Sequence, residues 1–318
     1  MDLLSSIFLD PFLRMGANPT FLVQVIWEGF VSGVLYALVA LGFVLIFKAS
    51  GVFNFAQGIM VVFAALALVG LHSMGMPAWG AVAAAVAIMF LLASGIERLV
   101  LRPLVNQPDI ILLMATIGLT RFLVGLGEMV FGGEPKVMIT EALGIPTGIV
   151  RIPLFGKNLI LKEIDITAAV VALLMVGFLA LFFARTKIGR ALRAVADDHQ
   201  AALSVGISLE KIWVIVWFAA GCVALVTGVM WGARSQVSFD LEIIALKALP
   251  VLILGGFTSV PGAIVGGLVI GIGEKMGEIY WGRLLGGGIE SWLAYLIALA
   301  FLLFRPQGLF GEKIIERV

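Results

Sequence analysis

The chain has 318 residues, of which 61% are hydrophobic and 13% are charged, and its formal net charge is +1. Soluble domains are about 45–50% apolar and about one quarter charged, so this composition excludes an ordinary soluble protein and predicts an integral membrane protein. The near-zero net charge gives no reason to expect a nucleic-acid partner.

Long apolar stretches follow one another along nearly the whole chain. A spanning helix needs roughly 20 apolar residues. We predict spans at residues 22–47, 52–71, 78–96, 110–131, 164–184, 212–231, 243–257, 262–276 and 292–304. The seventh and eighth are short and rich in glycine, so the predicted count is eight or nine spans. The predicted fold is an all-α, polytopic helical membrane bundle with glycine-rich broken segments, in a single domain covering residues 1–318.

The N-terminal segment, residues 1–20, lacks the basic start and the small-residue cleavage site of a signal peptide. Its apolar and polar residues instead predict a short interfacial helix at 3–13. We expect this helix to be broken at Pro11 and to end before Pro19.

Basic residues near the span ends set the predicted orientation. With nine spans, Arg98 and Arg102, the basic residues of the 185–211 loop and those after the last span all fall on one side. The positive-inside rule assigns that side to the cytoplasm. The N-terminus and the 132–163 segment then lie outside, and the C-terminus is cytoplasmic. Alternating residues around Gly156 predict a β-hairpin within the outer segment.

The sequence lacks the motifs of common catalytic and metal sites. It contains no phosphate-binding G-x-x-x-x-G-K-[ST] loop, no H-E-x-x-H or paired-cysteine metal spacing and no G-x-S-x-G elbow. We therefore expect no catalytic residues, no metal and no cofactor bound by this chain itself. A pump without its own nucleotide site must borrow an ATPase from a partner.

One polar helix is predicted in the 185–211 loop, between Gly189 and Gly206. Apolar residues at Leu192, Val195 and Leu203 fall on one face of this helix. The helix is either a solvated connector lying on the membrane or a docking helix for a cytoplasmic partner, and we expect its 201–206 end to face that partner. The candidate coupling residues are Arg193, Asp197, Asp198, Gln200, Ala201, Ala202, Val205 and Gly206.

Two glycine-rich segments, 47–58 and 254–267, interrupt apolar runs. Irregular backbone at membrane depth is tolerated where protein or a water-filled path satisfies it. Asn54, Phe55 and Gln57 are candidates for lining a translocation path or for forming a tight turn. The second break contains Gly255, Gly256, Gly262, Gly266 and Gly267; for the last three of these glycines we favour close helix packing.

Ionisable residues also fall inside predicted spans, where they cost several kcal/mol unless paired or hydrated. Arg121 lies midway along its span, with Glu128 seven residues later on the same face, and Lys247 lies near Glu242. Structural pairing is the simpler interpretation of Arg121 and Lys247, and contact with a permeating zwitterion is the functional one. Glu274 is interpreted as an ordinary residue near a span end.

Four ordered motifs resemble one known family. They are "GVLYALVALGFVLIFKASGVFNFAQG", "TKIGRALRAVADDHQAALSVGI", "LKALPVLILGGFTSVPGAIVGGLVIG" and "FRPQGLFG". Together they are similar to the permease subunits of bacterial branched-chain amino acid ABC importers, in particular the shorter, H-type permease. Arg121 and the Asp197-Asp198-His199 triplet depart from the family pattern.

The resemblance implies a permease of the bacterial inner membrane that forms half of a path. A second, longer permease subunit would complete the path as a heterodimer, with a homodimer as the alternative. Two cytoplasmic ATPase subunits would bind ATP and Mg, and the 185–211 loop would contact them. A periplasmic binding protein would deliver a branched-chain or hydrophobic amino acid, or a related small amide, urea or carboxylate.

Two other functions remain open. An ion-coupled secondary transporter needs carboxylates near the membrane midplane, whereas Asp165, Asp240 and Glu242 are expected near span ends. A structural subunit of a membrane complex is the third interpretation. Dependence of transport on ATP separates these functions.

Overall fold

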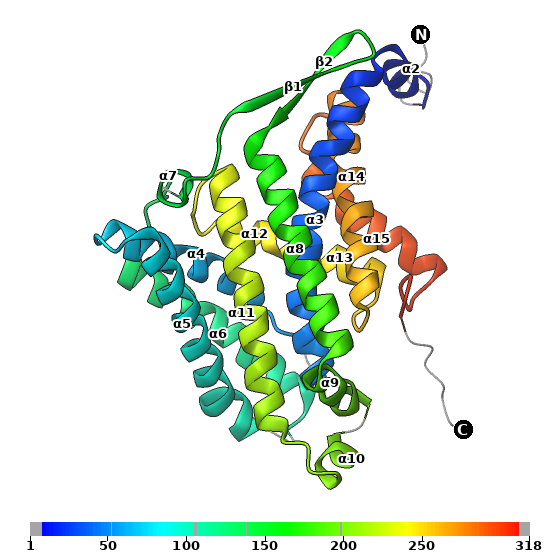
Figure 1. Cartoon of the computed structure of the whole chain (residues 1–318). Helices are drawn as coiled ribbons and strands as arrows, with labels where there is room; N and C mark the ends of the chain where they lie inside the picture. Colours follow the sequence, from blue (N-terminus) through cyan, green and yellow to red (C-terminus); the bar gives the residue numbers. More distant parts are fainter. Residues whose placement is uncertain (1–7, 52, 105–106, 138, 198, 312–318) are drawn as a thin grey trace.

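The computed structural model describes residues 8–51, 53–104, 107–137, 139–197 and 199–311. Six of its helices are long and apolar enough to cross a membrane. They are α3 (Pro19–Ser50), α5 (Ala78–Ile96), α6 (Asp109–Phe131), α8 (Glu163–Arg185), α11 (Leu209–Arg234) and α14 (Val260–Leu285). Two shorter apolar helices, α4 (Gln57–Ser73) and α15 (Leu293–Phe304), complete a helical membrane bundle (Figure 1), which confirms the predicted fold class.

The remaining elements are short. A π-helical segment, η1 (Glu97–Leu101), and a 3₁₀ turn, η2 (Arg102–Leu104), extend α5. The other short helices are α2 (Asp10–Ala17), α7 (Ile139–Leu143), α9 (Lys187–Asp197), α10 (His199–Ser204), α12 (Leu241–Leu246), α13 (Ala248–Gly255) and η3 (Ile289–Ser291). Strands β1 (Ile149–Leu154) and β2 (Lys157–Lys162) form the hairpin predicted around Gly156, where Phe155 and Gly156 both have positive φ, as a two-residue type I′ turn requires.

The predicted span at 243–257 is wrong as a continuous helix. The structure divides it at Lys247 into α12 and α13. Pro250 gives the reason: it has no N–H to offer to the carbonyl of Leu246, and its ring crowds that carbonyl. The chain then ends α13 at Gly256, which has a φ of 102°.

The N-terminal helix also differs from its prediction. Helix α2 begins at Asp10, and Pro11 is buried in its first turn. Proline suits that position because the missing N–H has no intrahelical partner there, so Pro11 starts the helix and does not break it. The predicted residues 3–7 lie outside the described residues.

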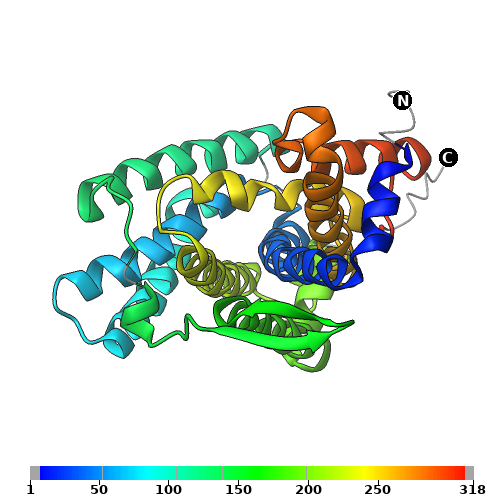
Figure 2. The same ribbon diagram turned by 90° about the horizontal axis from the view of Figure 1, so that it is seen from above.

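Helix α3 is the centre of the bundle, and α8, α11 and α14 enclose it (Figure 2). Helix α3 is apolar on all sides, and nearly all of its residues after Gly29 are buried. Glycines let α14 approach it closely: a Cβ built on Gly33 would lie 2.7 Å from the carbonyl oxygen of Gly267, and Gly29 faces Gly271 in the same way. Both helices therefore contribute a G-x-x-x-G motif to one antiparallel contact.

The two ends of the bundle are different. Helix α2 and the β-hairpin lie at one end, and α9 and α10 lie at the other (Figure 1). Thr20 at the start of α3 donates a hydrogen bond of 2.8 Å to the carbonyl of Leu154, which fixes the hairpin over that end. This arrangement agrees with the predicted placement of the 132–163 segment and the 185–211 loop on opposite sides.

Candidate translocation and coupling sites

The first glycine-rich break is a turn that connects α3 to α4. Gly51 ends α3 with a φ of 72°. Asn54 is 1% exposed, and its Oδ1 accepts a hydrogen bond of 3.0 Å from the N–H of Ala56. The Asn54 side chain thus shapes the turn that starts α4, as asparagine does in many turns.

Gln57 and Phe55 also pack inside the bundle. The Gln57 side chain is fully buried, rests on Gly42 and donates from Nε2 to the carbonyl of Ala220 at 3.4 Å, while its Oε1 has no protein partner. The ring of Phe55 meets Phe53 edge to face at 4.8 Å. The structure does not place Asn54 or Gln57 on an open surface, so path lining by these residues stays a prediction that requires the helices to move.

Arg121 and Glu128 are brought onto one exposed stripe of α6. Both side chains are exposed, and neither forms an ion pair with another described residue. Between and beside them, a Cβ on Gly118 or Gly125 would meet no atom within 4 Å. Helix α6 lies along the edge of the bundle (Figure 2). A cation midway along a spanning helix is costly to expose to lipid alone, so we expect this stripe to face another subunit or water.

Lys247 is paired within the chain. Its ammonium lies at the break between α12 and α13, contacts Glu274 and donates to the backbone carbonyl of Glu290 at 3.1 Å. Lys247 and Glu274 side chains are 15% and 2% exposed. The expected proximity of Glu242 is not the pairing observed, and the interpretation of Glu274 as a residue near a span end is wrong, because α14 continues to Leu285.

The structure contains a further charge pair that the sequence analysis did not identify. Arg234 of α11 donates from Nε to Oδ1 of Asp165 in α8 at 2.8 Å, and its guanidinium lies 5.0 Å from the ring centroid of Trp231. The two residues are 69 positions apart, so no local spacing reveals them. This pair ties α8 to α11 at the end where the hairpin lies.

Glycines at the second break hold helices together. A Cβ on Gly255 or Gly262 would run into the backbone of the other. A Cβ on Gly266 would lie 2.6 Å from the carbonyl oxygen of Val251, and one on Gly267 would lie 2.6 Å from that of Gly33. These contacts match the favoured interpretation of Gly262, Gly266 and Gly267 as packing residues.

The predicted loop helix is two helices. Helix α9 ends at Asp197 and α10 begins at His199. Asp198 and the side chain of Asp197 lie outside the described residues. Leu192 and Val195 are buried, as predicted, and α9 packs against α3, α8 and α11. Arg193 donates from Nη1 to the carbonyl of Phe183 at the end of α8, at 2.8 Å.

The far end of the loop departs from the predicted face. Ala202 is 2% exposed and packs against its own chain, whereas Leu203 and Val205 are 53% and 74% exposed. A continuous helix would place Leu203 beside Leu192 on one face. In the structure Leu192 is buried whereas Leu203 is exposed, so the two residues do not share a buried face. Gln200, Ala201 and Gly206 are also exposed. An exposed apolar pair beyond the ends of the spanning helices is typical of a protein interface.

Comparison with known proteins finds a family model and relatives that match most of the chain. The family model described as the permease component of a branched-chain amino acid transport system matches residues 25–305. The high-affinity branched-chain amino acid transport system permease protein BraD of Pseudomonas aeruginosa is 28% identical over 314 residues, covering 93% of this chain and 98% of BraD.

Two further relatives are also permease proteins of branched-chain amino acid transport. The permease protein LivH of the high-affinity branched-chain amino acid transport system of Escherichia coli K12 is 27% identical over 326 residues, covering 94% of this chain and 98% of LivH. The probable branched-chain amino acid transport permease protein LivH of Methanocaldococcus jannaschii is 30% identical over 300 residues, covering 87% and 89% of the two chains.

Proposed function

This chain belongs to the family of branched-chain amino acid transport permeases, and from this premise we propose that it is one membrane subunit of an ATP-driven importer. In this proposal it lies in the bacterial inner membrane with α2 and the hairpin outside. A second permease subunit, two ATPase subunits and an external binding protein complete the importer. The cargo is a branched-chain or other hydrophobic amino acid.

The α9–α10 pair carries the proposal. Its exposed residues Leu203 and Val205 offer an apolar patch at the end of the bundle away from the hairpin. Buried Leu192 and Val195 join the same pair to the spanning helices. A push on α10 is therefore passed to α3, α8 and α11 through α9 as a small rigid-body displacement.

The exposed stripe of α6 supports a path shared with the second permease. Arg121 has no ion-pair partner among the described residues, and the α-carboxylate of an amino acid offers the complementary charge. Arg121 and Glu128 are seven residues apart, which corresponds to roughly 10 Å along a helix. The carboxylate and ammonium of one amino acid are much closer than this, so the two side chains serve successive positions of a passing zwitterion.

The test is to make the α10 patch charged. We expect the Leu203→Glu, Val205→Glu double variant to insert normally but to lose at least about tenfold in ATP-dependent uptake, because a docked partner cannot desolvate two carboxylates cheaply. The matched control is Leu203→Met, Val205→Ile, which keeps the patch apolar. Normal uptake and normal ATPase co-purification by the glutamate variant contradict the docking assignment.

A further inference from the structure

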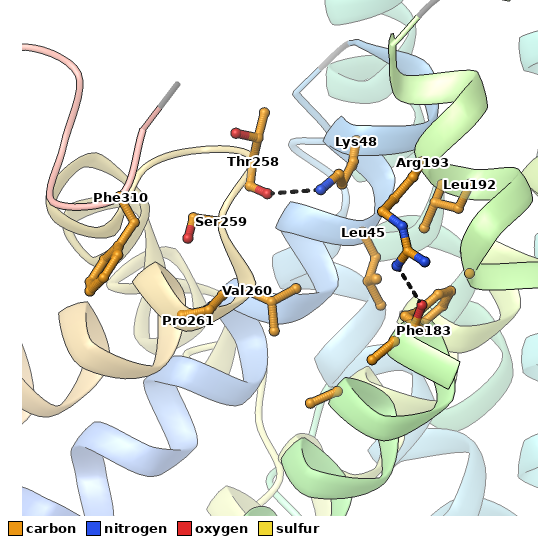
Figure 3. A pocket seen from close by; sticks show the side chains of 13 residues that line it. Leu45, Lys48, Phe183, Leu192, Arg193, Thr258, Ser259, Val260, Pro261 and Phe310 are labelled. Carbon is orange, nitrogen blue, oxygen red and sulfur yellow. Dashed lines mark hydrogen bonds between the residues drawn. The ribbon is translucent and has the colours of Figure 1, made fainter. Parts of the chain in front are cut away.

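A cavity of about 510 Å³ opens beside α9, at the end of the bundle opposite the hairpin (Figure 3). It lies among the last turns of α3 and α8, the first turn of α9, the loop before α14 and Phe310. Its volume is in the range of small-molecule pockets, roughly 300–1,000 Å³. Because α3 and α8 end here and α14 begins here, the cavity lies at the level where spanning helices leave the lipid.

The cavity has two cations and no acid. None of its 13 lining residues is Asp or Glu, whereas Lys48 and Arg193 both line it. Lys48 Nζ donates to the carbonyl of Thr258 at 3.5 Å, and Arg193 Nη1 donates to that of Phe183 at 2.8 Å. Neither forms an ion pair with an acidic side chain of the described residues, which do not include the side chain of Asp197, and both positive charges line one cavity.

The N-terminus of α14 adds to the positive electrostatic potential at the cavity. Ser259 caps this helix by accepting a hydrogen bond of 3.0 Å from the N–H of Gly262, and both Ser259 and Val260 line the cavity. The positive end of the helix dipole therefore lies at the wall of the same cavity as the two cations. The cavity is suited to an anion with several oxygen acceptors.

The remaining wall is apolar and continues into the membrane region. Leu45, Leu192 and Phe310 line the cavity beside Ala180 and Ala184 of α8. Ala184, Ala180 and Gly177 follow one another at about one helical turn, and a Cβ on Gly177 would meet no atom within 4 Å. These small residues leave a shallow strip that runs from the cations along α8 toward the bilayer core.

We propose that this cavity binds the phosphate headgroup of an anionic phospholipid from the adjacent leaflet. The phosphate oxygens accept from Lys48 and Arg193, and one acyl chain lies on the strip formed by Ala184, Ala180 and Gly177. Free phosphate would use the cations but leave the strip unused. An acidic segment of a partner protein would do the same. Basic pockets between spanning helices are suited to anionic headgroups.

In this proposal the bound lipid connects α9, which transmits the displacement of α10, to the spanning helices α3 and α14. Arg193 belongs to α9, Lys48 to α3, and the Ser259 cap to α14. A phosphate held by these residues links α9 to both α3 and α14 at one point. Anionic lipid is thus expected to raise the thermal stability of the chain, because a ligand that binds only the folded state stabilises that state.

The test measures lipid binding to the full chain in phosphatidylcholine nanodiscs, with phosphatidylglycerol as the titrant and native mass spectrometry and thermal unfolding as readouts. We expect Lys48→Gln, Arg193→Gln to weaken phosphatidylglycerol binding about 30-fold, since each basic contact with a headgroup is worth roughly fivefold. The control Lys187→Gln, Arg190→Gln removes the same charge from exposed residues of α9 that do not line the cavity.

A second variant tests the strip without touching the charges. Ala184 is exposed, so Ala184→Phe leaves the fold intact but fills the strip. We expect it to weaken phosphatidylglycerol binding several-fold. Equal loss of binding in the cavity variant and in the control overturns the proposal. Displacement of the lipid by millimolar inorganic phosphate, or full binding by Ala184→Phe, also overturns it in favour of a free-anion site.

Discussion

The buried pair of Lys247 and Glu274 gives the sharpest stability prediction. Glu274 is 2% exposed in the middle of α14, and Lys247 is the only described side chain that forms an ion pair with it. Lys247→Met leaves a carboxylate buried without a counter-charge, which costs roughly 3–5 kcal/mol. Removing both charges with Lys247→Met, Glu274→Leu restores much of this loss, because a well-packed apolar pair is often as stable as a buried ion pair.

The assay is a double-mutant cycle on purified protein, with the free energy of unfolding measured by denaturant in detergent. We expect the single variant Lys247→Met to be less stable than the double variant by about 2 kcal/mol or more. The control is Lys275→Met, which breaks a pair with Glu290 whose side chains are 29% and 41% exposed. That loss is expected to be at most about 1 kcal/mol. A single variant as stable as the double variant would refute the reasoning.

Four further variants separate packing from transport. Gly33→Ala places a methyl group against the carbonyl of Gly267 and is expected to destabilise the chain by roughly 1–3 kcal/mol in thermal unfolding, whereas Gly177→Ala, in open space, is expected to be near neutral or stabilising. Arg121→Gln is expected to lower uptake several-fold with an unchanged melting temperature, because the side chain is exposed; equal loss of both would make Arg121 structural. Asn54→Ala is expected to cost about 1 kcal/mol through the lost turn hydrogen bond, and a change in uptake at unchanged stability would instead place Asn54 on the path.

Hydropathy predicts the helices, because the lipid phase demands long apolar runs. The hairpin is predictable from a different signal, because Gly156 permits a turn conformation that few residues adopt. Hydropathy fails where a local backbone effect lies inside an apolar run. Lys247 and Pro250 mark the break in the predicted 243–257 span, but the apolar run around Pro250 keeps the hydropathy of the segment high and hides that break. The predicted 262–276 span is too short: Glu274 is expected near the end of that span, but it forms an ion pair with Lys247, and α14 continues to Leu285.

The candidate coupling site at 189–206 also shows where prediction from sequence fails. The periodicity of the 189–206 segment places Leu192 and Leu203 on one face only if the helix is continuous. In the structure Ala202 is buried whereas Leu203 and Val205 are exposed, so the docking variant has to be made at Leu203 and Val205. Long-range pairs such as Asp165 with Arg234 are invisible to spacing rules, because the fold alone brings α8 beside α11.

The central claim is that this chain transports only when an ATPase acts on α9 and α10. The most direct test reconstitutes it in sealed vesicles with a candidate second permease, ATPase subunits and binding protein from the same organism, and measures uptake of a branched-chain amino acid. We predict uptake that requires ATP, ignores ionophores and is lost in Leu203→Glu, Val205→Glu. Uptake driven by an ion gradient without ATP would contradict the account.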